Sequence, residues 1–156
     1  INSLVELFFI KFKEINSISD KPFLKWLNDN DKNDFLTWKQ VETYIQILSR
    51  HLKKDLNKGD RCILLSENRP EWLISDIAIM NAGGVTVPLF TTYSEKDYEY
   101  IINDCRPKIL IVSNYTQLKK VEKFISKEIK VLSIENINED IESIENFFND
   151  FSKKKI

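Results

Sequence analysis

Residues 67–94 restrict the possible folds more than any other stretch, because they read as a buried helix that runs directly into a strand. Pro70 presets a helical φ in the first turn, and Asn68 lies where its side chain can cap free amides. Apolar side chains occupy more than one face of this helix, which predicts burial of most of its surface. Gly83 can take the left-handed conformation that ends a helix. A helix that leads into a strand is half of a crossover unit between parallel strands.

The same alternation of helix and strand continues to the end of the sequence. β-branched residues predict a strand at 85–87, which we expect to be central in the sheet, although Pro88 limits where it can pair. Further strands are expected at 61–66, 109–112 and 130–134, and helices at 37–52, 94–105, 114–125 and 137–151. Residues 109–112 are apolar on both faces, as in a covered parallel strand. The predicted fold class is α/β, a mostly parallel sheet with helices on both faces.

The N-terminal part carries a different pattern. A helix is expected over 3–13, and two aromatic-rich runs at 23–27 and 35–38 predict a hairpin with a polar tip. We therefore expect one α/β subdomain over 1–156. Within it, 1–36 form the helix and hairpin, and 37–156 form the alternating α/β core.

Charge and cysteine content bound the function. The net charge is −1 over 156 residues, so nothing indicates a nucleic-acid partner. The two cysteines, Cys62 and Cys105, lie in or beside apolar segments and are expected to be reduced, buried thiols of a cytoplasmic protein. No run has the length of a membrane span. Peripheral attachment at the inner membrane is left open.

Recognisable catalytic motifs are missing from this sequence. Its three glycines allow neither a dinucleotide-binding fingerprint nor a phosphate-binding loop. The single histidine, His51, has no second ligand or nucleophile near it in sequence, so a surface or helix-end role is expected. No metal ligands and no catalytic residues are assigned.

Two features suggest a binding site. Residues 90–94 follow the strand at 85–87, at the end of a parallel strand where open α/β sheets bind ligands. Their hydroxyls and the next helix N-terminus can contact an anion, or they can form an ordinary loop with a serine cap. Lys119 and Lys120 can contact a phosphate, or they can lie on a solvated helix face.

An ordered series of short motifs, spread over residues 23–114, resembles a known family. The series comprises Phe35-Leu36-Thr37-Trp38, Gly59-Asp60-Arg61, Asn68, Glu71-Trp72, Ala82-Gly83-Gly84-Val85-Thr86-Val87-Pro88-Leu89, Ser94, Tyr100-Ile101-Ile102-Asn103-Asp104 and the strand at 108–112. In this order it is similar to the N-terminal part of the adenylate-forming (AMP-binding) acyl-CoA synthetases. The segment that ends in Val-Pro-Leu is most like the long-chain fatty acid–CoA ligase branch.

The resemblance implies a two-step reaction of the parent enzyme. A carboxylate attacks the α-phosphate of ATP, with Mg²⁺, to form an acyl-adenylate, and the thiol of coenzyme A then displaces AMP. The family's phosphate loop and later catalytic motifs would lie beyond Ile156, so we expect the chain alone to be inactive and to bind none of these cofactors tightly. The implied partners are a fatty acid and the remainder of the AMP-binding domain. Apolar surface left exposed would favour self-association.

The resemblance also implies one set of contacts. Phe90, Thr91 and Thr92 would lie along the nucleotide of coenzyme A, and Lys119 and Lys120 would supply the basic groups for its phosphate.

Two alternative functions remain. The chain can belong to another adenylate-forming enzyme, such as an aryl–CoA ligase or a peptide-synthetase adenylation domain, or it can be a free-standing, non-catalytic flavodoxin-like binding module.

Overall fold

A five-stranded sheet forms the centre of the molecule. The structure, a computed structural model, describes residues 3–14, 20–27 and 32–153, with side chains as far as residue 149. The strands lie in the order β4-β3-β5-β6-β7, and each neighbouring pair is parallel. Their bounds are β3 (Arg61–Leu65), β4 (Val85–Leu89), β5 (Ile109–Val112), β6 (Lys130–Ser133) and β7 (Glu142–Ser143). The predicted parallel sheet is confirmed.

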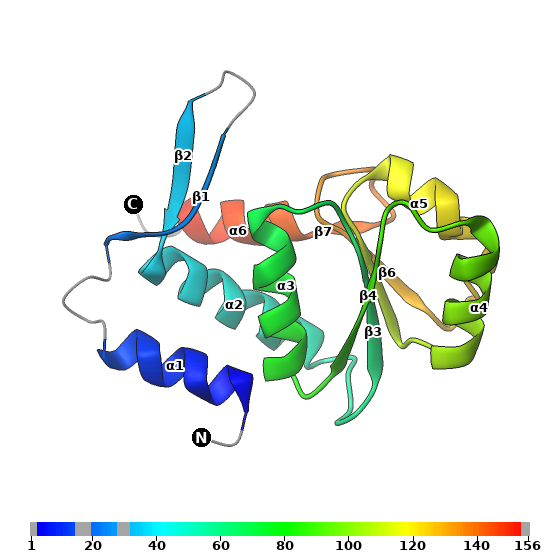
Figure 1. The fold of residues 1–156 in the computed structure, drawn as a ribbon, viewed down its shortest axis with the longest axis horizontal. Helices are drawn as coiled ribbons and strands as arrows, with labels where there is room; N and C mark the ends of the chain where they lie inside the picture. Colours follow the sequence, from blue (N-terminus) through cyan, green and yellow to red (C-terminus); the bar gives the residue numbers. More distant parts are fainter. Residues whose placement is uncertain (1–2, 15–19, 28–31, 154–156) are drawn as a thin grey trace.

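Helices cover both faces of this sheet (Figure 1). One face carries α1 (Leu4–Glu14), α2 (Trp38–Leu52), α3 (Pro70–Asn81) and α6 (Ile144–Lys153). The other carries α4 (Glu95–Cys105), α5 (Tyr115–Val121) and the short 3₁₀ helix η2 (Glu122–Phe124). Within the described residues, no helix combines the length and the apolar character needed to cross a bilayer.

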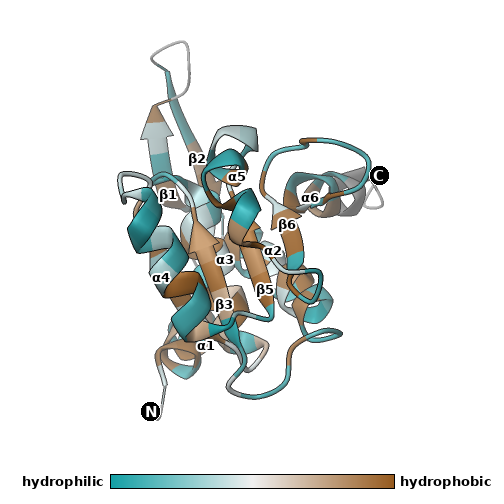
Figure 2. Cartoon of the chain, turned by 90° about the vertical axis from the view of Figure 1, so that its right-hand side faces the viewer, coloured by the Kyte–Doolittle hydropathy of each residue, from teal (hydrophilic) through white to brown (hydrophobic). Residues whose placement is uncertain are grey.

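The central strands β3 and β5 contribute side chains to the hydrophobic cores on both faces of the sheet, which explains why their sequences are continuously apolar. In β3, Leu64 packs toward the α2 and α3 side, whereas Ile63 and Leu65 pack toward the α4 and α5 side. All four residues of β5 are buried in the same alternating manner. Figure 2 shows these strands as the most apolar part of the chain, with the outer surface of α4 hydrophilic.

Two predictions concern the helix that begins at Pro70, and the structure confirms the one for its end but not the one for its start. Gly83 has φ +94° and follows the helix end, so the predicted stop is confirmed. The predicted cap at Asn68 is wrong, because Arg69 is the N-cap residue and no side chain caps this helix. The residue before a proline is pushed into extended backbone, and Arg69 has φ −147° and ψ 161°. The helix therefore begins one residue later than a cap at Asn68 would require.

The strand β4 lies at an edge of the sheet, so its predicted central position is wrong. Within the described residues it pairs only with β3. After β4, the chain crosses through α4 to the other side of β3 and forms β5 there. This reversal of direction creates a topological switch point between β3 and β5.

The last predicted helix, 137–151, is only partly correct. The structure places the two-residue strand β7 first, and α6 begins at Ile144. Ile144 and Phe148 are buried on the α2 side, whereas Ile137 and Ile141 pack against the other core. Isoleucines at helical spacing therefore serve two different faces of the sheet.

The predicted N-terminal helix and hairpin are present. Strands β1 (Pro22–Leu27) and β2 (Asn33–Thr37) pair in antiparallel fashion, and the tip at 28–31 lies outside the described residues. Phe23 stacks on Trp38 with ring centroids 3.9 Å apart, and Phe8 of α1 covers both rings. The hairpin is therefore joined to the core through an aromatic contact at its base, and it projects away from the sheet in Figure 1.

Candidate functional site

The turn at residues 90–93 leaves the sheet at the carboxyl end of β4. The Tyr98 hydroxyl donates a hydrogen bond to the Phe90 carbonyl at 2.9 Å, and the Tyr93 amide donates to the same oxygen at 3.2 Å. The Tyr98 side chain is 1% exposed, so this contact is anchored in the core below α4. Ser94 and Asp97 form a capping box that fixes the start of α4. The turn is thus fixed at its own carbonyl and at the helix that follows.

The structure brings Lys120, but not Lys119, to this turn. Lys120 is half-buried on α5, and its Nζ donates to the carbonyl of Thr91 at 2.7 Å. Lys119 is exposed; its Nζ lies 3.0 Å from Glu122 Oε1 and 5.3 Å from the centroid of the Tyr115 ring. The two neighbouring lysines therefore have different surroundings.

The three remaining predicted site residues lie together on the turn. Phe90 is 69% exposed and meets the edge of Tyr93 at 5.3 Å between ring centroids. Thr91 is half-buried and Thr92 is exposed. An exposed aromatic ring beside two hydroxyls offers both a stacking surface and polar contacts to a ligand.

A pocket of about 290 Å³ adjoins Phe90 at the carboxyl ends of β3 and β4. Its wall combines apolar side chains with two polar residues, and it is lined by Ser66, Asn68, Trp72, Pro88, Leu89 and Phe90. A second pocket, of about 370 Å³, lies between α3 and the hairpin and shares Asn68 and Trp72 with the first. The first pocket therefore adjoins the turn, and the second lies next to the first, on its hairpin side.

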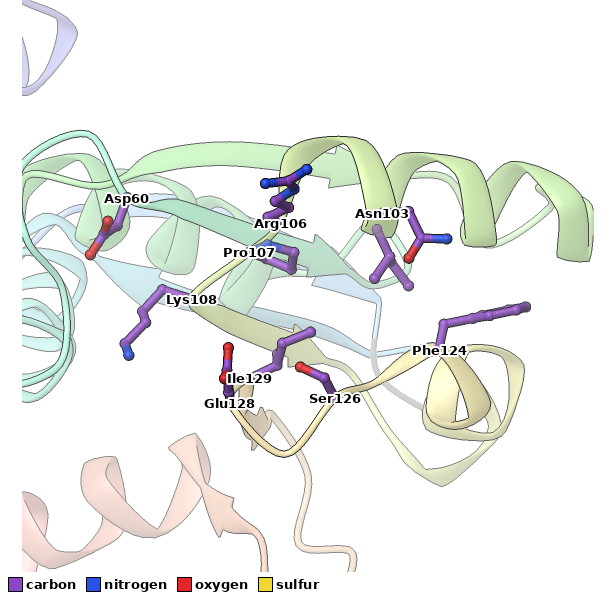
Figure 3. Close-up of a pocket in the computed structure, with 10 residues that line it drawn as sticks. Asp60, Asn103, Arg106, Pro107, Lys108, Phe124, Ser126, Glu128 and Ile129 are labelled. Carbon is purple, nitrogen blue, oxygen red and sulfur yellow. The ribbon is translucent and has the colours of Figure 1, made fainter.

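A larger pocket, of about 560 Å³, lies at the opposite, amino-terminal end of the strands (Figure 3). Charges of both signs line it, with Arg106 and Lys108 on the entry to β5, and Asp60 and Glu128 before β3 and β6. Parallel sheets bind ligands at the carboxyl ends of their strands. The mixed charge also favours no single class of ligand, so we place the candidate site at the turn.

Sequence reasoning missed a polar cluster at the switch point itself. Gln117 Nε2 donates to Glu67 Oε1 at 2.6 Å, joining the ends of β3 and β5. Gln117 is 5% exposed, and the buried hydroxyl of Ser113 lies in the same region, directly after β5. These side chains lie at the carboxyl ends of the strands that flank the switch point, where this topology usually binds a ligand. Polar residues directly after apolar strands were the available signal, but Glu67 and Gln117 are 50 positions apart.

Both cysteines are poorly suited to nucleophilic chemistry. Burial raises the pKa of the Cys62 thiol, which is fully enclosed in the core. Burial likewise raises the pKa of Cys105, which is half-buried. Because the thiolate is the reactive form, these shifts oppose reactivity. Among the residues that the structure describes, no group of three or more His, Cys, Asp or Glu side chains could hold a metal ion.

His51 lies in the last turn of α2, as expected for a helix-end residue, and contacts the C-terminal segment. Its Nε2 is 2.7 Å from Glu142 Oε2, and its ring lies 4.3 Å from the Phe147 ring. Lys130 Nζ approaches the same carboxylate at 3.2 Å. His51 therefore helps to fasten β7 and α6 to the core.

Acidification should weaken this attachment. Burial acts to raise the pKa of Glu142, but its contacts with Lys130 and His51 outweigh burial and hold the pKa below its usual value. A carboxyl group with a lowered folded pKa stabilises the fold above its unfolded pKa and loses that contribution as pH falls through the folded pKa. Glu142→Gln should therefore lower the free energy of unfolding near neutral pH, and the deficit should shrink as the pH falls below about 4.3, the ordinary pKa of a glutamate, and through the lowered pKa of the folded state.

Urea unfolding at a series of pH values checks this prediction. Glu139→Gln is the matched control, because Glu139 is an exposed carboxylate in the preceding loop. A deficit for Glu142→Gln that does not change with pH would contradict the prediction.

Comparison with known proteins gives a consistent result. The model of the family described as AMP-binding enzyme matches residues 13–154. Fatty acyl-CoA synthetase A of Dictyostelium discoideum is 36% identical over 118 residues, which are 72% of this chain and 17% of that protein. The long-chain-fatty-acid–CoA ligase ACSBG1 of Rattus norvegicus is 29% identical over 92 residues, which are 55% of this chain and 13% of that protein.

A solved structure supports the fold. The acetoacetyl-CoA synthetase from Streptomyces lividans superposes with a TM-score of 0.78, at 13% sequence identity, over 90% of this chain and 24% of that chain. At this identity the likeness concerns the fold alone. The chain thus spans only a small part of the length of each of these proteins.

Proposed function

Since this chain belongs to the AMP-binding enzyme family, whose model matches residues 13–154, we propose that its parent is an ATP-dependent long-chain fatty acid–CoA ligase. The observation that carries the proposal is the 36% identity to a fatty acyl-CoA synthetase over most of the chain. The parent would join a fatty acid to AMP and then transfer the acyl group to the thiol of coenzyme A. Membership of this family also argues against an unrelated flavodoxin-like module.

Within that enzyme, we propose that this chain is the first α/β subdomain of the AMP-binding domain and serves mainly as a scaffold. The 1–36 helix and hairpin and the 37–156 α/β core would act as one unit against the remainder of the domain. The chain does not fit ATP or Mg²⁺. Its three glycines allow no phosphate-binding loop, and its described part offers no metal-ligand cluster. No step of the adenylation is therefore assigned to its residues.

For coenzyme A the chain offers a better fit. We propose that Phe90, Thr91 and Thr92 lie along the coenzyme A nucleotide, with Lys119 and Lys120 as the adjacent basic groups. The exposed ring of Phe90 can stack on a base, and the threonine hydroxyls and the exposed Lys119 ammonium group are donors suited to phosphate. The thiol transfer itself would take place elsewhere in the parent.

The proposal predicts that the 156-residue chain alone is catalytically silent. ATP–pyrophosphate exchange with palmitate should remain at the level of a no-protein control, because the described residues offer no metal-ligand cluster that would polarise the α-phosphate. Robust exchange would contradict the scaffold role.

The product of the complete gene tests the substrate. We expect AMP release that depends on both coenzyme A and palmitate, and that exceeds the rate with benzoate or with an amino acid. A preference for benzoate would indicate an aryl–CoA ligase, and aminoacyl-adenylate formation without coenzyme A would indicate a peptide-synthetase adenylation domain.

We also propose that the isolated chain self-associates through exposed apolar side chains. Leu27 of the hairpin is 65% exposed, Phe35 is 48% exposed and Phe90 is 69% exposed. Sedimentation velocity over a range of concentrations should show an average mass that rises with concentration, and a constant monomer mass would contradict this.

The proposed location of the parent is the cytoplasm. Salt extraction of membranes tests whether the parent is also attached peripherally to the inner membrane.

A further inference from the structure

The turn at residues 90–93 uses its carbonyl groups in protein contacts and leaves its central amides free. The Phe90 carbonyl accepts from the Tyr98 hydroxyl and the Tyr93 amide, and the Thr91 carbonyl accepts from Lys120 Nζ. Within the described residues, the amides of Thr91 and Thr92 meet no protein acceptor. In a turn closed between its first and fourth residues, these are the two central amides.

Peptide planarity links each fixed carbonyl to one free amide. The Phe90 carbonyl and the Thr91 N–H belong to the same peptide unit and point in opposite directions, as do the Thr91 carbonyl and the Thr92 N–H. The Tyr98 hydroxyl and the Tyr93 amide hold the first carbonyl and so fix the direction of the Thr91 amide. Lys120, by holding the second, fixes the direction of the Thr92 amide. Successive free N–H groups of a turn are the donors from which anion-binding concavities are built.

The two anchors come from different helices and act independently. Tyr98 reaches the turn from α4 and is 1% exposed, so its hydroxyl has little freedom to move. Lys120 reaches it from α5, across 29 positions of sequence. Loss of Lys120 should release the Thr91 carbonyl, whereas loss of the Tyr98 hydroxyl leaves the Phe90 carbonyl with the Tyr93 amide as its donor. Each variant should therefore loosen one peptide unit rather than the whole turn, and the effect of the Lys120 variant should be the larger.

We propose that Tyr98 and Lys120 are positioning residues that aim the amides of Thr91 and Thr92 at a phosphate of coenzyme A. The identity of the ligand rests on the proposed function. Lys120 then acts through the Thr91 carbonyl, and its ammonium group is not the phosphate contact. This differs from the simpler expectation that neighbouring lysines bind the phosphate directly.

Amide NMR of the ¹⁵N-labelled chain tests the proposal with three variants. Lys120→Met should shift the Thr92 amide resonance of the ligand-free chain and speed its exchange with solvent, and Tyr98→Phe should do the same at Thr91. Lys119→Met is the matched control for these ligand-free measurements, because Lys119 contacts Glu122 and Tyr115 rather than the turn. Unshifted β3 and β5 resonances will show that each variant is folded.

Titrations with coenzyme A and with 3′-dephospho-coenzyme A form the second arm. In the unsubstituted chain, both ligands should shift the Thr91 and Thr92 amides. Lys120→Met should weaken both ligands by a similar factor of about ten, as expected when a turn loses a charge-assisted hydrogen bond that shapes it.

The outcomes separate the anchoring of the turn from the assignment of coenzyme A as its ligand. If Lys120→Met leaves the ligand-free Thr92 amide unchanged and weakens coenzyme A, Lys120 contacts phosphate directly and the positioning role is overturned. If neither ligand shifts the unsubstituted chain while the two variants still move their own amides, the coenzyme A assignment fails and the anchoring of the turn stands.

Discussion

Leu64→Ala should lower the free energy of unfolding by about 3–4 kcal/mol, because it leaves a cavity in the middle of the sheet. Leu64 is fully buried in β3, between β4 and β5, and packs under α2 and α3. Such a loss is a large fraction of the roughly 5–15 kcal/mol that stabilises a typical domain. The midpoint of urea unfolding, followed by circular dichroism, measures it.

A graded series keeps this prediction decisive even if Leu64→Ala unfolds the chain. Ile111→Val, in the neighbouring strand β5, removes one buried methylene and should cost about 1 kcal/mol. Tyr100→Ala is the surface control; Tyr100 is 69% exposed on α4, and its loss should change stability by at most about 0.5 kcal/mol. Equal effects at Leu64 and Tyr100 would show that β3 is not the centre of the core.

Arg69→Leu should lower the free energy of unfolding by about 2 kcal/mol at neutral pH, and this deficit should shrink in acid. The Arg69 guanidinium lies 2.8 Å from Glu71, 2.6 Å from Glu135 and 3.5 Å from Glu145. Without it, three carboxylates converge on one place with no shared cation. Because Glu135 and Glu145 are 44% and 40% exposed, solvent reduces the cost below that of a fully buried cluster.

The pH dependence follows from Glu145. Burial raises the pKa of Glu145, and the charges of Glu71 and Glu135 raise it further, whereas Arg69 opposes them. A carboxyl group with a raised folded pKa destabilises the fold above that pKa, and the penalty disappears as pH falls through it. The variant loses the opposing cation, so its penalty is larger, and acidification should restore more stability to it than to the original chain.

Urea titrations at several pH values measure this effect. The control is Lys11→Met, which breaks the exposed Lys11–Glu14 pair and should cost no more than about 0.5 kcal/mol at any pH. A deficit for Arg69→Leu that grows toward acid would contradict the electrostatic explanation.

Local patterns in the sequence were enough to predict most helices and strands and their parallel pairing, but not strand β7 or the start of α6. The apolar run at 109–112 forms a buried strand. The helices expected from residues 37, 94 and 114 begin directly after these residues, and Thr37, Ser94 and Asn114 are their N-caps. The position of β4 in the sheet could not be predicted in this way. A run such as 85–87 has the same β propensity at an edge as in the centre, and only the path of the chain after it decides between them.

Long-range contacts set the limit at the candidate site. Lys119 and Lys120 are adjacent on a seven-residue helix, so a rotation of one position decides which of them reaches Thr91. The Glu67–Gln117 contact and the Arg69 cluster likewise join segments from different crossover units. Spacing within one element carries no information about such pairs.

The two edges of the sheet also govern how copies of this chain can meet. The Val85 amide faces β3, where it donates to the Asp60 carbonyl, so Pro88, three residues on, turns its ring nitrogen to the open side. That side lacks a donor at the position, and the opposite edge, β7, is only two residues long. Both edges are therefore poor templates for strand addition. If copies associate, they should form side-chain contacts that dissociate on dilution, and they should not nucleate cross-β fibres.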